Sequence, residues 1–169
     1  MPPLPVPAES VNEPYALVIS RQFSLFRRFD VLRQACASQG FQFAAFIVVW
    51  TGLSLRLANP PWSFGPAQIG AFGLVGLASI TSAAWVGRMV DRFGARQVIT
   101  GCSGMTLLGV IGLIVWDTSV VAILVSMCCI DFGVQGSYVA NQSRVLSLDL
   151  AARSRLGALL FISAFGAAA

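Results

Sequence analysis

Long apolar runs, separated by short segments that carry arginine, constrain the fold of this chain more than any other feature. Of its 169 residues, 56% are hydrophobic and only 11% are charged, whereas a soluble domain carries about 25% charged residues. A run of about 20 apolar residues is long enough for a helix to cross the hydrocarbon core of a membrane. We therefore predict an all-α membrane protein with four transmembrane helices, over about 34–57, 66–86, 97–116 and 120–139.

The two ends of the chain differ from these spans. The last apolar run, 156–169, reaches only about 21 Å as a helix, against a hydrocarbon core about 30 Å thick, so it is predicted to be an incomplete fifth helix. Residues 1–33 begin with a proline-rich stretch and are predicted to be a cytoplasmic linker-like segment. Within it, residues 15–29 suit an amphipathic surface helix. Both ends favour a truncated piece of a longer membrane protein.

The distribution of arginine predicts the orientation of the spans. All of the positive charge comes from eleven arginines, since the chain has no lysine, and only Arg56 falls on one side of the predicted spans. The other ten lie in segments on the opposite side. Cytoplasmic segments carry an excess of basic residues. We therefore expect the N-terminal segment and a second basic loop, 141–155, to be cytoplasmic.

The segment from Gly87 to Arg96 reads G-x-x-x-D-R-x-G-x-R and joins the second and third predicted spans. Because arginines at this density are costly in hydrocarbon, the pattern predicts a short loop at the membrane surface. Gly94 permits a tight reversal, and Gly87 allows a neighbouring backbone to approach closely. Asp91 suits a charge-assisted hydrogen bond or a helix N-terminus. A generic basic loop would need the arginines, but not Asp91 and two glycines at this spacing.

Polar and aromatic side chains share one face of the first predicted span. Gln39 and Gln42 are followed at helical spacing by Phe46 and Trp50. Such a stripe can line a transport pathway or pack against a neighbouring helix, and the residues alone favour neither interpretation.

The fourth predicted span carries a second polar stripe. Asp131, Gln135, Tyr138 and Gln142 fall on one helix face. Asp131 lies about eleven residues into the span, close to the membrane midplane. A charge there costs about 2.5–3.5 kcal/mol, so the side chain should face a cavity or a partner. The residues alone therefore place Asp131 against a cavity, or in a structural hydrogen bond or ion pair between helices.

The Gly87–Arg96 pattern resembles motif A of the major facilitator superfamily of secondary transporters. Nearly the whole chain is similar to the second half of a bacterial drug-efflux member of that family. The similar segments are Phe46 to Trp50, Pro60-Pro61, the glycine-rich second span, Asp131-Phe132-Gly133-Val134-Gln135, Asn141-Gln142-Ser143-Arg144 and Ala152-Arg153-Ser154-Arg155-Leu156. The resemblance implies helices seven to ten of a twelve-helix fold, followed by part of helix eleven.

The resemblance also implies a function. Members of the family export small molecules by alternating access between two halves, often coupled to protons, in the bacterial inner membrane. It implies a gating motif, formed by Gly87, Asp91, Arg92, Gly94 and Arg96. Candidate pathway-lining residues, on this resemblance, are Gln39, Gln42, Trp50, Asp131, Gln135 and Tyr138. The resemblance also makes Asp131 the candidate for the coupling proton. The expected partners are the lipid bilayer, an unidentified small-molecule substrate, and a missing N-terminal half or a second copy of the chain.

Other functions are less consistent with the sequence. The chain has no histidine, and no serine or cysteine nucleophile has a base near it, so we do not expect an enzyme, a cofactor or a metal site. Nothing resembles a nucleic-acid module. The four cysteines show no paired ligand spacing and are predicted to be buried thiols: Cys36, Cys102, Cys128 and Cys129. The alternative to a transporter is a truncated or non-transporting membrane fragment that needs a partner half.

Overall fold

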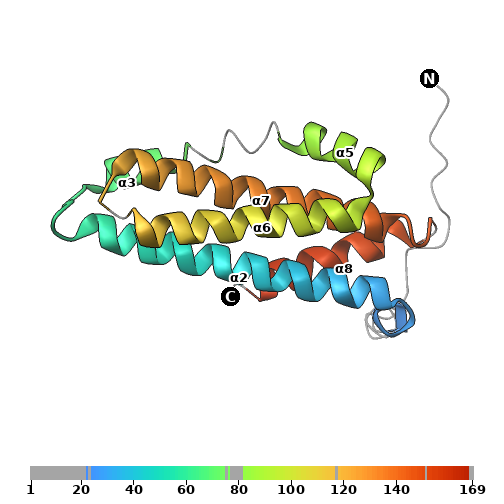
Figure 1. Cartoon of the computed structure of the whole chain (residues 1–169). Coiled ribbons are helices and arrows are strands. Elements are labelled where there is room, and N and C mark those ends of the chain that lie inside the picture. The colour runs from blue at the N-terminus through green and yellow to red at the C-terminus, as the bar shows by residue number, and fades with distance from the viewer. Residues whose placement is uncertain are drawn as a thin grey trace, which may run out of the picture.

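The computed structural model describes residues 22, 24–74, 76, 82–116, 118–150 and 152–167, and every regular element among them is a helix (Figure 1). The helices are α2 (Asp30–Ala58), α3 (Pro66–Phe72), α5 (Ser82–Phe93), α6 (Ala95–Val115), α7 (Val120–Leu146) and α8 (Arg153–Gly166). Helix α7 is central, because it contacts α2, α5, α6 and α8. The chain is an all-α membrane protein.

Three of the described helices, α2, α6 and α7, are long and apolar enough to cross a membrane. Helix α2 extends beyond the first predicted span at both ends, and α7 extends beyond the fourth at its C-terminal end. Helix α6 begins two residues before the third predicted span and ends one residue before its predicted end. The prediction of a basic loop over 141–155 is wrong for residues 141–146, because these residues are helical and α7 ends only at Leu146. The polar side chains in this part of α7 do not end the helix, because they can be solvated or can bond to a neighbouring helix. Arg144, in the last turns of α7, donates a hydrogen bond from Nη2 to Gln34 Oε1 at 3.5 Å.

The second predicted span, 66–86, is described only at its ends. Helix α3 begins as expected at Pro66, and the Gln68 side chain accepts a hydrogen bond from the Gly65 amide at 2.9 Å. It ends at Phe72, and α5 begins at Ser82. Residues 75 and 77–81, in the middle of the predicted span, lie outside the described residues.

The closest packing is between α6 and α7, which form an antiparallel pair. A Cβ atom built on Gly109 would lie 2.7 Å from the carbonyl oxygen of Ser126, and one on Gly133 would lie 2.6 Å from the carbonyl oxygen of Cys102. Small residues let two helix backbones approach closely in lipid. Gly70 of α3, by contrast, has no packing neighbour among the described residues within 4 Å of a Cβ built on it.

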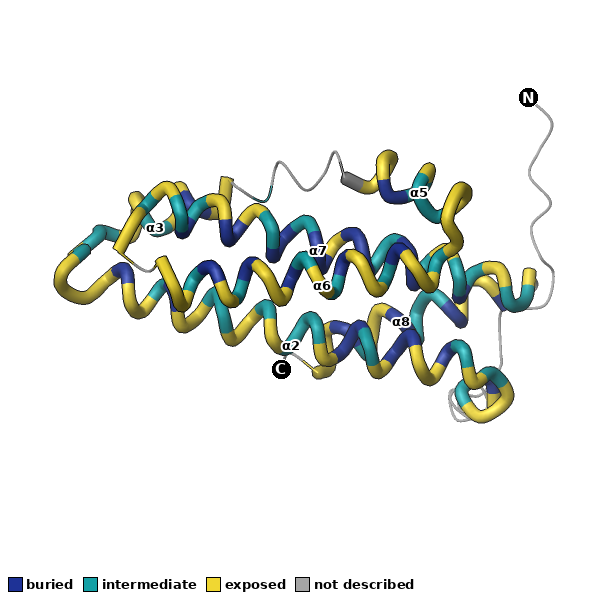
Figure 2. The backbone as a smooth tube through the Cα atoms, in the orientation of Figure 1, coloured by how far each residue is buried: buried dark blue, intermediate teal, exposed yellow. Residues whose placement is uncertain are grey.

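A second interface joins α2 to α8 around Leu32 and Leu160, both fully buried. Residues 24–28, which precede α2, are helical, and Leu25 packs into the same cluster while Arg27 and Arg28 are exposed. Most of the amphipathic helix predicted over 15–29 lies outside the described residues. Figure 2 shows buried residues along the facing sides of the helices and exposed ones on the outside.

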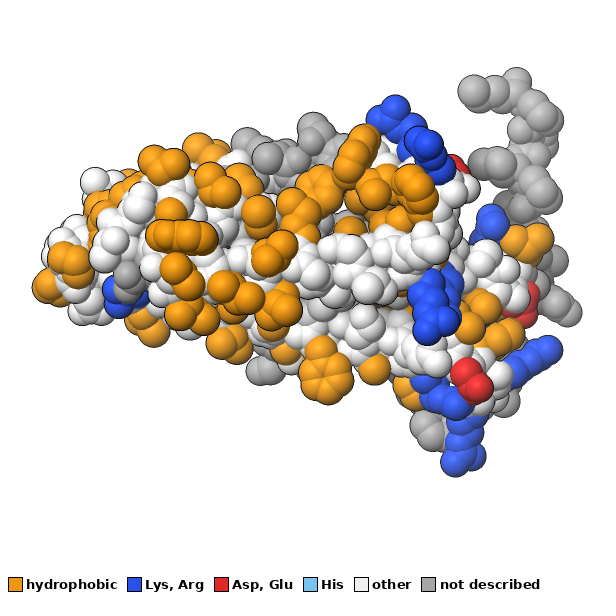
Figure 3. Space-filling model, viewed as in Figure 1, with side chains coloured by type: hydrophobic (Ala, Val, Ile, Leu, Met, Phe, Trp, Pro, Cys, Tyr) orange, Lys and Arg blue, Asp and Glu red, His pale blue; other side chains and the backbone are white. Residues whose placement is uncertain are grey.

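Apolar side chains cover much of the outer surface, as expected of helices that contact lipid. Leu108, Ile114 and Val121 are each at least two-thirds exposed. Figure 3 shows the arginine side chains, in blue, at one end of the bundle, apart from a single blue patch at the other end. We call the first of these the arginine-rich end. The prediction of four buried thiols is only partly correct: Cys36 and Cys102 are buried, Cys129 is half-buried and Cys128 is exposed on the outer face of α7.

Candidate functional site

A ladder of polar side chains runs along the contact between α2 and α7. We call it the polar seam and define it by these residues: Gln34, Gln39, Gln42 and Trp50 of α2, and Arg144, Asn141, Ser137 and Asp131 of α7. The two helices are antiparallel, so the residue numbers rise along α2 as those of the facing residues fall along α7. From Gln34 to Trp50 the seam covers about 24 Å of helix.

Hydrogen bonds join the first three rungs of the polar seam. Gln34 accepts from Arg144 at the exposed end, and Asn141 Nδ2 donates to Gln39 Oε1 at 3.3 Å in the buried interior. Gln42 Nε2 donates to Ser137 Oγ at 2.9 Å and to Ser103 Oγ of α6 at 3.0 Å. The Gln42 side chain therefore ties three helices together.

The fourth rung pairs Asp131 with Trp50. Asp131 is only 5% exposed and sits in the twelfth position of α7. The indole of Trp50 interacts with its carboxylate, yet Trp50 Nε1 and Asp131 Oδ2 are each buried without a hydrogen-bond partner. No closed hydrogen bond therefore joins the Trp50 indole to Asp131 Oδ2. An acidic group this deep in an apolar bundle is costly unless it is neutralised or solvated.

The structure brings together some of the predicted pathway residues and separates others. Gln39, Gln42 and Trp50 of α2 all face α7, and Asp131 faces α2. Gln135, however, is exposed, and Tyr138 is half-buried beside the cluster that joins α2 to α8. The predicted stripe on α7 is thus divided between the polar seam and the outer surface.

Sequence reasoning missed three residues of this region. Ser137 and Asn141 lie one helical step away from the predicted stripe on α7, and Ser103 lies on α6, for which no polar stripe was predicted. Ser137 and Asn141 are buried to 0% and 1% exposure. Small polar residues within an apolar run were the available signal, because Ser and Asn in such positions commonly bond across helices.

The Gly87–Arg96 segment is a helix junction rather than a loop. Residues 87–93 complete α5, and α6 begins at Ala95, so the prediction of a loop over the whole segment is wrong. Gly94 is the single non-helical residue, with φ 83° and ψ 148°, and the tight reversal expected there is confirmed. The close approach expected at Gly87 is not made within the described chain, where no atom lies within 4 Å of a Cβ built on it.

The charged residues of this junction point away from the bundle. Asp91, Arg92 and Arg96 are all exposed, and the described part of the chain gives Asp91 no ion pair or hydrogen bond to its side chain. The Arg92 guanidinium lies 5.2 Å from the centre of the Phe93 ring. These side chains are positioned to meet lipid headgroups, water or another surface.

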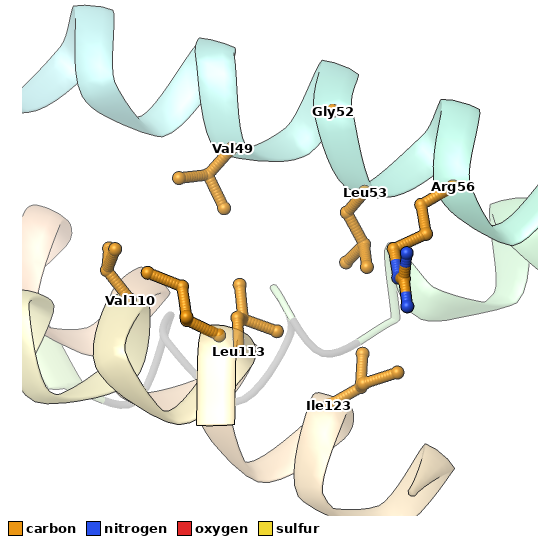
Figure 4. Close-up of a pocket in the computed structure, with 8 residues that line it drawn as sticks. Val49, Gly52, Leu53, Arg56, Val110, Leu113 and Ile123 are labelled. Carbon is orange, nitrogen blue, oxygen red and sulfur yellow. The ribbon is translucent and has the colours of Figure 1, made fainter. Parts of the chain in front are cut away.

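A cavity of about 220 Å³ opens near the end of the bundle opposite the arginine-rich end, between α2, α6 and α7 (Figure 4). Apolar side chains such as Leu53, Val110 and Ile123 line most of it. Arg56 reaches from α2 across the cavity toward α7. The described lining contains no residue of the polar seam, so this cavity offers apolar shape and one guanidinium but no acid–base group.

The chain is similar in sequence to proteins that are named as transporters. The chain is 31% identical over 153 residues to the uncharacterized transporter YgaY of Escherichia coli, strains K12 and O157:H7. It is 32% identical over 124 residues to the probable transporter SCO4007 of Streptomyces coelicolor. These matches cover 89% and 73% of the chain, but only 38% and 29% of the relatives, so the chain spans well under half of their length. No family model matches, and no solved structure matches.

Proposed function

We propose that this chain forms part of a secondary active transporter of the major facilitator superfamily, which exports small molecules by alternating access and is coupled to protons. Three helices able to cross a membrane and similarity to proteins named as transporters support a transport role. The resemblance of the Gly87–Arg96 segment supports the finer assignment to the superfamily and to its drug-efflux type.

One observation carries the proton-coupling part of the proposal: Asp131 is buried deep in α7 and its Oδ2 has no hydrogen-bond partner. A carboxylate held only for structure would be expected to have its oxygens bonded, because an unsatisfied charged group in a membrane is costly. A carboxyl group that alternates between protonated and ionised forms must keep one oxygen available. In our proposal Asp131 carries the coupling proton, and Trp50, Gln135 and Tyr138 line the pathway around it.

The α5–α6 junction acts as the gating element in this proposal. Gly94 sets the reversal, and Gly87 presents a helix surface without a side chain. The exposed charges of Asp91, Arg92 and Arg96 are available to a surface outside the described chain. Pairing of Asp91 with a helix N-terminus of the other half would favour one access state.

The transport unit needs helices in addition to those described. Gln135 is polar and exposed on a membrane-crossing helix, a position that is unfavourable against lipid. We propose that an N-terminal half, or a second copy of this chain, covers that face. We also propose the bacterial inner membrane as the location, with the arginine-rich end and the N-terminus in the cytoplasm.

Reconstitution in liposomes tests the proton-coupled function. The chain is incorporated into vesicles at a density that lets two copies associate, because the proposal needs a second copy to cover the open face. The vesicles contain a pH-sensitive dye, a proton gradient is imposed, and ethidium is added as a representative lipophilic cation. We expect ethidium to accelerate proton movement in the wild type and to have no such effect in Asp131→Asn. The matched control is Asp30→Asn, which removes an exposed carboxylate paired with Arg33 at the membrane surface and should leave the effect unchanged.

The same assay can contradict the proposal. Equal ethidium-dependent proton movement in the wild type and in Asp131→Asn would remove Asp131 from the coupling mechanism. Equal movement in vesicles with and without protein would argue against export of this class of cation by the chain.

A further inference from the structure

The inner rungs of the polar seam leave two buried polar atoms without a protein partner. Gln39 is fully buried, and its Nε2 donates to nothing, although its Oε1 accepts from Asn141. Gln42 Oε1 is also buried and unpartnered. A buried amide group without a partner costs several kcal/mol in an apolar environment. Two such atoms on adjacent rungs, about one helical turn apart, indicate polar partners that the described chain does not supply.

The geometry around Gln42 suits water. Its Nε2 is within 3.0 Å of two serine hydroxyls, Ser103 Oγ and Ser137 Oγ, so polar side chains of three helices converge there. A buried water needs two to four polar partners. Gln42 Oε1, Gln39 Nε2 and the two hydroxyls supply donors and acceptors of both kinds. The polar partners therefore match the needs of one or two ordered waters.

The seam is exposed at the arginine-rich end, where its outermost rung joins Gln34 to Arg144. Further along the seam, Phe46 and Val134 occupy the register position between the Gln42 and Asp131 rungs, within one apolar cluster. The Phe46 ring lies 5.9 Å from Phe43 and 6.3 Å from Trp50, centre to centre. An apolar step thus separates Gln42 from Asp131.

We propose that ordered water fills the polar seam from the arginine-rich end as far as Gln42, and that Phe46 separates this water from Asp131. The waters complete the hydrogen bonds of Gln39 and Gln42. This inference concerns the occupancy of the seam and does not depend on transport by the chain.

Radiolytic footprinting tests it, because hydroxyl radicals formed in place oxidise side chains that touch bound water. Two single-cysteine variants are compared in liposomes, Ser137→Cys and Ser126→Cys, after replacement of Cys36, Cys102, Cys128 and Cys129 by alanine. Both serines are buried on α7, but Ser126 packs against Gly112, away from the polar seam. We expect oxidation about ten-fold faster at position 137, where the water site lies. Equal rates at the two positions would overturn the proposal.

Asn141→Cys provides a second probe of the same rungs, should Ser137→Cys fail to fold. Its oxidation should also exceed that of Ser126→Cys by about ten-fold. If the cysteines at positions 137 and 141 are both oxidised as slowly as the cysteine at position 126, no water is bound at these rungs and the proposal is overturned.

The apolar step is tested in the otherwise native chain. Phe46→Ala should raise the oxidation of Trp50, on the Asp131 side of the step, by about five-fold, because water then passes the step. Phe43→Ala is the control, since Phe43 stacks on Phe165 of α8 at 4.8 Å rather than closing the seam. The same Trp50 rate in all three proteins would remove Phe46 as the barrier. A hydrated seam with unchanged proton coupling in Asp131→Asn would refute the proposed function and leave this inference intact.

Discussion

Gln42 on α2 donates a hydrogen bond to Ser137 on α7, a residue 95 positions later in the chain, at 2.9 Å. Together with the bond from Gln42 to Ser103 on α6, it fixes the register of three helices at one point. Apolar packing in lipid is poorly directional, because lipid tails are as apolar as the side chains they replace. A polar bond between helices is therefore a local determinant of how the bundle aligns.

Replacement of Gln42 by leucine should weaken the bundle. Gln42→Leu removes two interhelical hydrogen bonds, and such bonds contribute about 0.6 kcal/mol each on average in membrane proteins. We expect a double-mutant cycle of Gln42→Leu with Ser137→Ala to give a coupling energy of about 0.6 kcal/mol. Unfolding in mixed detergent, followed by tryptophan fluorescence, measures the four free energies.

The control for this cycle is Gln135→Leu with Ser137→Ala. Gln135 is exposed, and side chains two residues apart on a helix do not face each other, so the two changes should be additive. A coupling energy near zero for Gln42 and Ser137 would mean that the bond does not contribute to stability.

A methyl group added at Gly133 should disrupt the contact between α6 and α7. The new Cβ would lie 2.6 Å from the carbonyl oxygen of Cys102 and 2.8 Å from the amide nitrogen of Thr106, and a backbone cannot move aside as a side chain can. Overpacking of this kind costs about 1–3 kcal/mol. We expect Gly133→Ala to lower the free energy of unfolding by that amount, measured in the same detergent titration.

Gly104→Ala is the matched control on the partner helix. No atom lies within 4 Å of a Cβ built on Gly104, so the added methyl group faces open space. Because alanine favours the helix by about 1 kcal/mol over glycine, this change should be neutral or stabilising. Equal destabilisation by both substitutions would show that the close α6–α7 approach is not the cause.

The sequence was sufficient for the features that follow from local physics. Apolar length predicted α2, α6 and α7, and the cost of a buried charge singled out Asp131 before any contact was known. Helical periodicity also placed Gln39, Gln42 and Trp50 on one face. It could not show which neighbour covers that face, because the crossing of two helices depends on packing along their whole length. Ser137 and Asn141 were therefore missed as partners, and Gln135 was grouped with Asp131 although it is exposed.

The arginine-bearing junction shows a second limit of sequence reasoning. The residues from Gly87 to Phe93 are polar enough to predict a loop, yet they remain helical in α5. Long arginine side chains reach the headgroups while their backbone stays in a helix. Only Gly94 leaves the helical conformation, and it is the one position where the sequence indicated a reversal.

Substitution of Gly94 should strain the α5–α6 junction. Its φ of 83° and ψ of 148° lie in a region that is essentially restricted to glycine, and a residue held there costs about 1–3 kcal/mol. Gly94→Ala should therefore lower the free energy of unfolding, or shift the junction. The control is Gly87→Ala, which lies within α5 with no neighbour within 4 Å and should not destabilise the chain. If Gly87→Ala leaves stability unchanged but abolishes ethidium-dependent proton movement, Gly87 contacts a surface outside the described chain.

The arginine distribution predicts which end of the bundle faces the cytoplasm, and two turns at opposite ends allow a direct test. Thr118 lies in the turn between α6 and α7, and Ser147 follows α7 at the arginine-rich end. Basic residues are enriched on the cytoplasmic side. In intact cells, an impermeant thiol reagent should label Thr118→Cys and not Ser147→Cys, and in inverted membrane vesicles the labelling should be reversed. Each variant is made without the four native cysteines, because Cys128 is exposed. Labelling of Ser147→Cys from outside intact cells would invert the proposed orientation, and with it the side from which water enters the polar seam.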